Sequence, residues 1–303
     1  MPTGETSKDL RGPAATGGDG ARPRSALTDR RPQVLRYRAF RAITALMLSG
    51  GEKGRVALTA LMLREMSTRY GRSPGGYIWA VLDPLGTILL LSLAMSFLVT
   101  IPPLGVSFVL FKATGMMPFG MYGSLSGAAS SAISFSRPLL RYPGVTWIDA
   151  LLARVVMNFL TTLLVAVLIF GGILLWSDTR TLLDLPKIFL AITLAALFGT
   201  GIGVCNIFFF MRFPAWEHTW AILNRPMLLA SGVLFLYETM PRMVQEVLWY
   251  NPLVHIISLM REGFYPMYHA DWVSVPFVLI SALVPLAAGL LLVRHHHVDL
   301  LNL

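Results

Sequence analysis

Thr68-Arg-Tyr-Gly-Arg-Ser-Pro-Gly-Gly-Tyr-Ile-Trp-Ala-Val-Leu-Asp-Pro84 shows most directly what kind of protein this is. It joins a basic, glycine-containing segment directly to an apolar run that continues to about Thr100. About 20 such residues cross the hydrocarbon core of a bilayer. The single charge in the run, Asp83, lies roughly one turn inside it, where a carboxylate is unfavourable unless protein or water surrounds it. The stretch therefore predicts a bend at Gly75-Gly76, followed by a first membrane span.

The composition of the whole chain indicates several such spans. Of its 303 residues, 55% are hydrophobic and only 14% are charged, and the mean hydropathy is +0.63. We predict an all-α, polytopic membrane protein with six transmembrane helices. The six predicted spans are Tyr77–Thr100, Val106–Ser131, Asp149–Trp176, Ile188–Met211, Thr219–Tyr237 and Val273–Val293.

The charge distribution predicts the orientation. Residues 1–76 hold 14 Lys and Arg against six Asp and Glu, whereas the remaining 227 residues hold 11 against 10. Positive charge beside a span favours the cytoplasmic side of the membrane, so this is a simpler explanation than binding to nucleic acid. With six spans, both termini are expected in the cytoplasm.

The segment before the first span divides into two parts. Residues 1–53 are predicted to be a basic, largely disordered cytoplasmic arm with a possible amphipathic helix. Residues 54–76 are predicted to form an interfacial amphipathic helix, because apolar residues in Arg55–Tyr70 recur at helical spacing while Arg64 and Arg69 mark another face. Residues 77–303 would form the transmembrane domain.

Two connections between spans stand out. Met240–Trp272 is long and apolar, yet Val247–Met260 is too short to span, so a re-entrant or gate helix pair is expected before the last span. Arg137-Pro-Leu-Leu-Arg-Tyr-Pro143 forms a short unit bounded by prolines, which favours a docking helix for a partner. An interfacial turn anchored by Trp147 is the alternative.

Polar groups inside the predicted spans are candidates for buried or water-facing positions. Asp83 and Arg225 are both expected near the cytoplasmic side, and we consider an ion pair between them. Lys112 and Arg154 lie close enough to span ends to extend toward the interface. Small residues at Ala195-x3-Gly199-x3-Gly203 predict close helix packing.

The sequence lacks a zinc-protease signature and a nucleotide-binding signature. It contains no H-E-x-x-H and no phosphate-binding G-x-x-x-x-G-K-[ST] motif, and Cys205 is its single cysteine. We expect no catalytic residues, metal site or cofactor in this chain. If transport uses ATP, a separate polypeptide must hydrolyse it.

Six motifs in order carry a resemblance to a known family. They are Arg69-Tyr-Gly-Arg-Ser-x-x-Gly-Tyr-x-Trp-Ala-x-Leu-Asp-Pro84, Pro102-Pro-Leu-Gly-x-Ser-Phe108, Arg137-Pro-Leu-Leu-Arg-Tyr-Pro143, Ser231-Gly-Val-Leu-Phe235, Tyr250-Asn-Pro-Leu-Val-His255 and Arg261-x-Gly-Phe-Tyr-Pro-x-Tyr268. Together they make residues 60–293 similar to the permease subunit of ABC exporters for capsular polysaccharide, to which the O-antigen exporters are related.

The resemblance implies a homodimer paired with two copies of a separate ATPase subunit, which would bind ATP and Mg²⁺. It also implies export of a lipid-linked polysaccharide, contact with membrane lipid, and periplasmic and outer-membrane export components, with no nucleic acid partner. An exporter of O-antigen, teichoic acid or a drug with the same architecture is the first alternative. A non-transporting scaffold or an intramembrane enzyme is the second.

The resemblance also nominates functional residues in three groups. The ATPase-docking loop would contain Arg137, Pro138, Leu140, Arg141 and Tyr142. Candidates for the channel or substrate path are Tyr77, Trp79, Phe108, Phe111, Phe119 and Tyr122, for each of which anchoring at the membrane interface is the alternative. The periplasmic gate would contain Tyr250, Asn251, His255, Arg261 and Tyr265.

Overall fold

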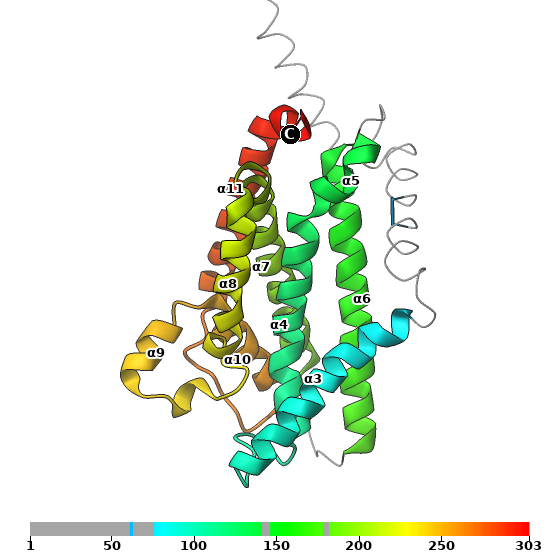
Figure 1. Ribbon diagram of the computed structural model, residues 1–303. Helices are drawn as coiled ribbons and strands as arrows, with labels where there is room; N and C mark the ends of the chain where they lie inside the picture. The colour runs from blue at the N-terminus through cyan, green and yellow to red at the C-terminus, as the bar shows by residue number, and fades with distance from the viewer. Residues whose placement is uncertain (1–60, 63–75, 141–145, 178–181, 303) are drawn as a thin grey trace, which may run out of the picture. The chain divides into compact units, whose positions relative to one another are not determined.

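The computed structural model describes residues 61–62, 76–140, 146–177 and 182–302, all of which belong to one compact unit, residues 52–303. Every regular element in these ranges is helical, so the all-α prediction is confirmed for them (Figure 1). The elements are α3 (Gly76–Leu98), α4 (Phe108–Ser130), α5 (Ala132–Leu140), α6 (Trp147–Trp176), α7 (Leu185–Arg212), α8 (Pro214–Ala230), the 3-10 helix η2 (Tyr237–Thr239), α9 (Arg242–Leu248), α10 (Pro252–Phe264) and α11 (Val275–Asn302).

Helix α7 is the packing centre of the bundle and contacts α4, α10 and α11. Small residues permit the close approach to α4. A Cβ on Gly199 would lie 2.6 Å from the carbonyl oxygen of Tyr122, and one on Gly203 would lie 2.5 Å from that of Ser126. The predicted small-residue face of α7 is therefore confirmed as a helix-packing face.

Four of the described helices are long and apolar enough to cross a membrane. They are the helical stretches Ile78–Leu98, Trp147–Trp176, Leu185–Arg212 and Val275–His296, which belong to α3, α6, α7 and α11. Helices α4 and α8 occupy the second and fifth predicted spans but do not meet the same standard of length and apolar composition. Thus four spans follow from composition, and the count of six does not.

Caps explain why the helix boundaries differ slightly from the predicted ones. Helix α6 begins at Trp147, two residues before the predicted start, because Thr146 and Asp149 form a capping box. The Thr146 hydroxyl accepts a hydrogen bond from the Asp149 N–H at 3.2 Å, and the Asp149 carboxylate accepts one from the Thr146 N–H at 3.0 Å. Asp149 therefore belongs to a helix end and is held by a local partner.

Two short helices, α9 and α10 with seven and 13 residues, lie where the re-entrant or gate helix pair is predicted, and their re-entrant character stays a prediction. Both are too short to cross a bilayer. The predicted N-terminal arm lies outside the described residues, and so does the predicted interfacial helix except for Leu61, Met62 and Gly76. Both of these N-terminal expectations stay predictions.

Candidate functional site

The corner between α8 and η2, residues 231–236, is a tightly packed connection that contains a glycine with positive φ. Gly232 has a φ of +78°, a conformation that favours glycine. Val233 is fully buried against α4, where a Cβ on Gly115 would lie only 3.1 Å from the Val233 Cα. This corner therefore lies directly on the α4 backbone, with its carbonyl groups in the protein interior.

Arg261 of α10 binds three of those carbonyl groups. Its side chain is 1% exposed. It donates hydrogen bonds to the carbonyls of Phe235 at 2.9 Å, Gly232 at 2.8 Å and Val233 at 3.2 Å. Its guanidinium carbon also lies 4.3 Å from the ring centroid of Phe111. The planar donors of arginine suit this combination of several acceptors and one aromatic face.

Lys112 of α4 binds the fourth carbonyl of the same corner. Its ammonium group donates to Leu234 at 3.1 Å and lies 5.2 Å from the Phe111 ring centroid. The side chain is fully buried, so the expectation that Lys112 extends to the membrane interface is wrong. The Lys112 side chain does not need to reach the interface, because the corner at residues 231–236 places a carbonyl acceptor beside its ammonium group. We call Lys112, Arg261 and Phe111 the carbonyl clamp.

The carbonyl clamp holds two positive charges in the interior with carbonyl oxygens as their ligands. No salt bridge to either cation occurs among the described residues. Burial lowers the pKa of Arg261 to about 10, which still leaves the guanidinium protonated at neutral pH. A buried charge is tolerated when hydrogen bonds replace its hydration. The corner carbonyls provide those bonds, so the corner and the cations depend on each other.

His255, one turn into α10, forms a second fixed point. The N–H of Ser274 donates to its Nδ1 at 3.2 Å, so the proton of the neutral ring is on Nε2, which donates to the carbonyl of Trp249 at 2.8 Å. Rings of Trp249, Trp272 and Phe277 surround the imidazole at centroid distances of 5.0–5.4 Å. Burial lowers the pKa of His255, and the hydrogen bond to Trp249 opposes that shift. A neutral His255 thus ties α10 to the start of α11.

The remaining contacts of this region connect its loops. Asn251 caps α10 through the Leu253 N–H at 3.1 Å and donates to the carbonyl of Ala230, the last residue of α8, at 2.9 Å. Glu238 accepts hydrogen bonds from Tyr268 at 2.7 Å and Trp272 at 2.8 Å. Residues 230–275 therefore form one unit, in which the end of α8 and the short helices are held to each other by side chains.

The structure brings together three of the five nominated gate residues, Asn251, His255 and Arg261. Tyr265 is buried beside Gly105, where a Cβ on the glycine would lie 2.6 Å from its ring. Tyr250 is 73% exposed. Lys112, Trp249, Trp272 and Glu238 were not nominated. The one feature of the sequence that could have indicated this group is Lys112, a single lysine in an apolar stretch. Its acceptor is a backbone carbonyl, which every residue has, so the sequence does not identify the acceptor.

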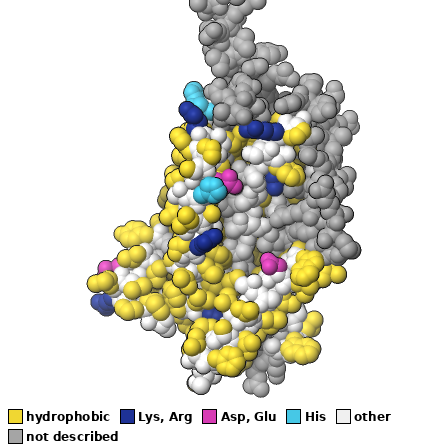
Figure 2. Space-filling model, viewed as in Figure 1, with side chains coloured by type: hydrophobic (Ala, Val, Ile, Leu, Met, Phe, Trp, Pro, Cys, Tyr) yellow, Lys and Arg dark blue, Asp and Glu magenta, His cyan; other side chains and the backbone are white. Residues whose placement is uncertain are grey.

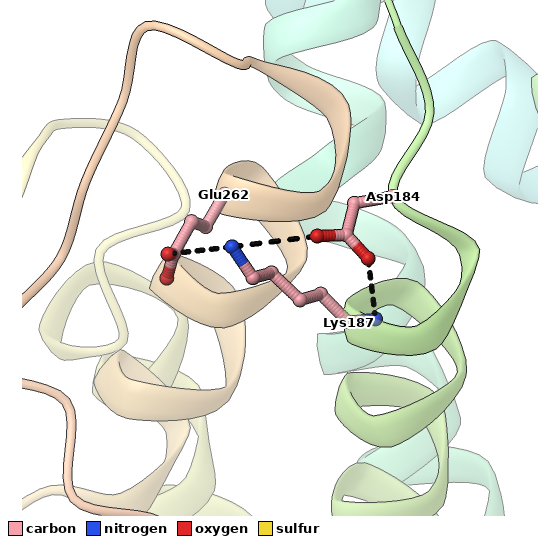
Figure 3. Close-up of polar contacts among 3 residues, drawn as sticks. All are labelled: Asp184, Lys187 and Glu262. Carbon is pink, nitrogen blue, oxygen red and sulfur yellow. Dashed lines mark hydrogen bonds and ion pairs between the residues drawn. The ribbon is translucent and has the colours of Figure 1, made fainter.

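Beside this unit, α10 and α7 are joined by an ion group that Figure 3 shows. The Lys187 ammonium lies 2.9 Å from a Glu262 oxygen and 3.4 Å from an Asp184 oxygen. The Asp184 N–H donates to the carbonyl of Gly263 at 2.9 Å. Asp184, Lys187 and Glu262 line a surface pocket of about 550 Å³. Its other lining residues are Leu182, Leu183, Leu185, Pro186, Pro266, Tyr268 and His269. The group fixes the end of α10 to the start of α7.

The nominated docking residues belong to α5 and the segment after it. Arg137 and Leu140 are half-buried in α5 and Pro138 is exposed, whereas Arg141 and Tyr142 lie outside the described residues. Helix α5 contacts α6 most extensively. Its role in docking stays a prediction, because no partner chain is present to test it.

Asp83 and Arg225, the two nominated intramembrane charges, are both exposed on their helices. No salt bridge joins them within the described chain, so the ion pair that we considered does not form inside one subunit. Arg225 lies on the second half of α8, away from the α7–α8 connection at Phe213. Each charge therefore remains available to water or to another chain.

The six nominated channel aromatics have different surroundings. Trp79 is 64% exposed, Phe108 and Phe119 are half-buried, and the side chain of Tyr77 lies outside the description. Phe111 is inside the carbonyl clamp. Tyr122 is buried, stacked on Phe198 at 5.3 Å. A role in a channel stays a prediction for all six. Burial does not favour that role for Phe111 and Tyr122.

Helix α8 differs from the other long helices because it buries none of its residues. Glu217, His218 and Arg225 are exposed on it. Figure 2 shows an acidic and a His side chain side by side, and a basic one further down, among hydrophobic side chains on this face. Three side-chain hydrogen bonds tie it to the rest of the described chain. The Tyr122 hydroxyl donates to Asn224 at 3.2 Å, Trp216 donates to Asn206 at 3.1 Å, and Asn251 donates to the Ala230 carbonyl at 2.9 Å.

Comparison with known proteins adds a consistent set of relatives. Residues 56–265 match the family described as ABC-2 type transporter. The polysialic acid transport protein KpsM of Escherichia coli is 31% identical over 248 residues, which cover 81% of this chain and 95% of that protein. The capsule polysaccharide export inner-membrane protein CtrC of Neisseria meningitidis serogroup A is 28% identical, over 77% of this chain and 88% of its own length. The corresponding protein BexB of Haemophilus influenzae is 26% identical, over 80% and 91%.

Proposed function

The chain belongs to the ABC-2 type transporter family, and on that premise we propose that it is the membrane subunit of an ATP-driven exporter of capsular, lipid-linked polysaccharide. The observation that carries the proposal is the near-complete coverage of relatives that are named for capsule polysaccharide export or polysialic acid transport. The alignments cover 88–95% of those three relatives and 77–81% of this chain, so the proposal concerns most of the protein and not one module of it.

The proposal includes a six-span topology in a bacterial inner membrane with both termini cytoplasmic. The names of two relatives as inner-membrane proteins support the location. Helices α4 and α8 would be the two spans that composition alone does not identify. For α4, burial supports this, since neighbouring helices cover Lys112 and the other polar residues that lower its hydropathy.

The exposed polar face of α8 supports a homodimer with a wet path beside this helix. In lipid, Glu217, His218 and Arg225 would be unfavourable unless a second subunit or water covers them. A glycan cannot cross hydrocarbon, so export needs such a path. Two copies related by symmetry would enclose it between their α8 helices. Periplasmic and outer-membrane components would continue the path.

The energy would come from a separate ATPase subunit, because the sequence has no phosphate-binding motif of its own. That subunit would bind ATP and Mg²⁺ and dock on α5 and the residues that follow it. ATP binding and hydrolysis would then shift α5 and the helices attached to it, as a rigid-body change between two states. The unit at residues 230–275, held by the carbonyl clamp, would be the gate at the periplasmic end.

The test is reconstitution with the ATPase subunit of a capsule exporter from the same organism. We expect the ATPase to copurify and wild-type proteoliposomes to export polysaccharide when ATP is present. The double variant Arg137→Ala, Arg141→Ala should insert normally yet lose coupled export. Arg212→Ala, exposed at the end of α7, is the matched control that should export normally. Full export by the double variant would exclude the docking assignment, and absence of a copurifying ATPase would exclude the proposed function.

A further inference from the structure

The joint between α4 and α5 has an unusual carbonyl acceptor. Helix α4 ends at Ser130 and α5 begins at Ala132, so Ser131 alone separates them. The Ser131 carbonyl accepts a hydrogen bond from the N–H of Phe135 in α5 at 3.0 Å. It also accepts one from the guanidinium of Arg154 in α6 at 3.1 Å. One oxygen thus binds two helices at the point where a third ends.

Arg154 makes a second contact with the same joint. Its guanidinium carbon lies 4.4 Å from the ring centroid of Phe135, the residue whose N–H shares the Ser131 carbonyl. A guanidinium can donate in its plane while its face lies on an aromatic ring. A positive group is also favourable near the carbonyl end of a helix such as α4. The two contacts therefore reinforce each other and would break together if α5 moved alone.

The base of Arg154 is firmly held within α6. The neighbouring residues Ala150, Leu151 and Ala153 are buried. Asn158, which is 2% exposed, donates to the Arg154 carbonyl at 2.7 Å one turn further along the helix. The Thr146–Asp149 capping box fixes the start of the helix below it. Displacement of α5 would therefore pull on a rigid part of α6 and not only on a flexible side chain.

We propose that Arg154 is a positioning residue that makes α5, the end of α4 and the start of α6 move as one body. Its role would be exerted through the contacts with Ser131 and Phe135. The inference rests on the proposed function, in which the ATPase docks on α5. In that setting the contact of Arg154 with Ser131 and Phe135 transmits the displacement of the docking helix to α4 and α6.

The experiment measures polysaccharide exported per ATP hydrolysed in proteoliposomes of the complete permease–ATPase complex. Arg154→Lys keeps the charge but loses the flat face, and Phe135→Leu loses the ring. Each should lower export per ATP about five-fold or more while ATP hydrolysis continues, in the range of typical coupling between sites. Because both remove one contact, the double variant should be no worse than the single ones. Phe135→Tyr, which keeps the ring, should export as much polysaccharide per ATP as the wild type.

Arg212→Lys is the matched control, because Arg212 is exposed beside the ring of Phe213 at 5.8 Å without joining helices in this way. It should leave export per ATP unchanged. Normal coupling in both single variants, or losses that multiply in the double variant, would overturn the inference alone. A merely structural role would instead lower the yield of complex and leave export per ATP unchanged. A wild-type chain that binds no ATPase would overturn the proposed function, and this inference with it.

Discussion

Lys112 and Arg261 illustrate how a protein of this composition keeps charge in its interior. Buried cations usually need carboxylate partners or strong hydrogen bonds, because desolvation disfavours the charged form. Here four consecutive carbonyls, from Gly232 to Phe235, serve that purpose. The arrangement joins side chains of α4 and α10 to one stretch of backbone. If the corner moved, both cations would lose their acceptors, and if either helix moved, corner carbonyls would lose their donors.

Removal of either cation should destabilise the protein to a different extent. Lys112→Met leaves one buried carbonyl unsatisfied, which costs about 1–3 kcal/mol. Arg261→Met leaves three unsatisfied, so a loss of about 3 kcal/mol or more is expected on the same basis. Thermal unfolding in detergent measures both. Lys187→Met is the control, since its ion pairs are partly exposed and worth roughly 0–1 kcal/mol. Equal effects of all three substitutions would contradict the clamp.

His255 should make the stability of the protein depend on pH. Burial keeps its pKa below the unfolded value of about 6.5. The unfolded state therefore binds the proton more readily, so stability is fully present above about pH 6.5 and falls as the pH decreases from there toward the folded pKa. Thermal unfolding at a series of pH values from 8 to 5 (about neutral to mildly acidic) measures this. His255→Gln, which can keep both hydrogen bonds without titrating, should flatten the profile over that range. An unchanged profile would exclude His255 as the cause.

At the scale of elements, packing against backbone determines which helix neighbours which. Glycines of α7 allow a close approach of α4, because a side chain at these positions would overlap carbonyl oxygens of α4. Helix α8, in contrast, is tied to the core by a few polar contacts and by the corner that follows it. The bundle therefore combines a closely packed pair, α4 and α7, with a helix that has little packing of its own.

Gly203→Ala should destabilise the α4–α7 pair. The new Cβ would lie 2.5 Å from the Ser126 carbonyl oxygen and 2.7 Å from the Ala129 Cβ, so the backbone must shift. Overpacking of this kind costs typically about 1–3 kcal/mol. Gly171→Ala in α6 is the matched control, because nothing lies within 4 Å of its added Cβ. It should be neutral or slightly stabilising, as expected for alanine in a helix. Thermal unfolding of both variants distinguishes them, and equal unfolding temperatures would exclude the close-packing account.

The sequence predicted the elements better than it predicted the contacts. Apolar runs located α3, α6, α7 and α11 because lipid-facing length is a property of composition. Spacing of small residues located the α7 packing face. The carbonyl clamp could not be predicted, because Lys112 and Arg261 are 149 positions apart and bind backbone atoms that every residue has. An Asp83–Arg225 pair was suggested by complementary charge, but charge alone does not say which helix faces which.

The proposed topology requires α8 to cross the membrane. Its 17 residues span about 26 Å at about 1.5 Å per residue, slightly less than the ~30 Å hydrocarbon core. The exposed charges of α8 would make it unfavourable for this helix to cross the bilayer alone. A second subunit or a wet path removes that objection, and then the short length suffices because the clamped corner extends the covered depth. Six spans and a wet path are therefore one proposal and not two.

The sidedness of two connections tests that proposal. Cys205 is the single native cysteine, so a Cys205→Ser background allows single cysteines to be placed at will. Phe213→Cys marks the α7–α8 connection, and Met267→Cys marks the exposed loop after α10. If α8 crosses, an impermeant maleimide added outside spheroplasts should label position 267 and not position 213. Leu182→Cys, exposed before the long apolar helix α7, calibrates the outer side and should be labelled like position 267. Labelling of positions 213 and 267 on the same side would remove α8 from the membrane, and with it the path through which the polysaccharide is proposed to move.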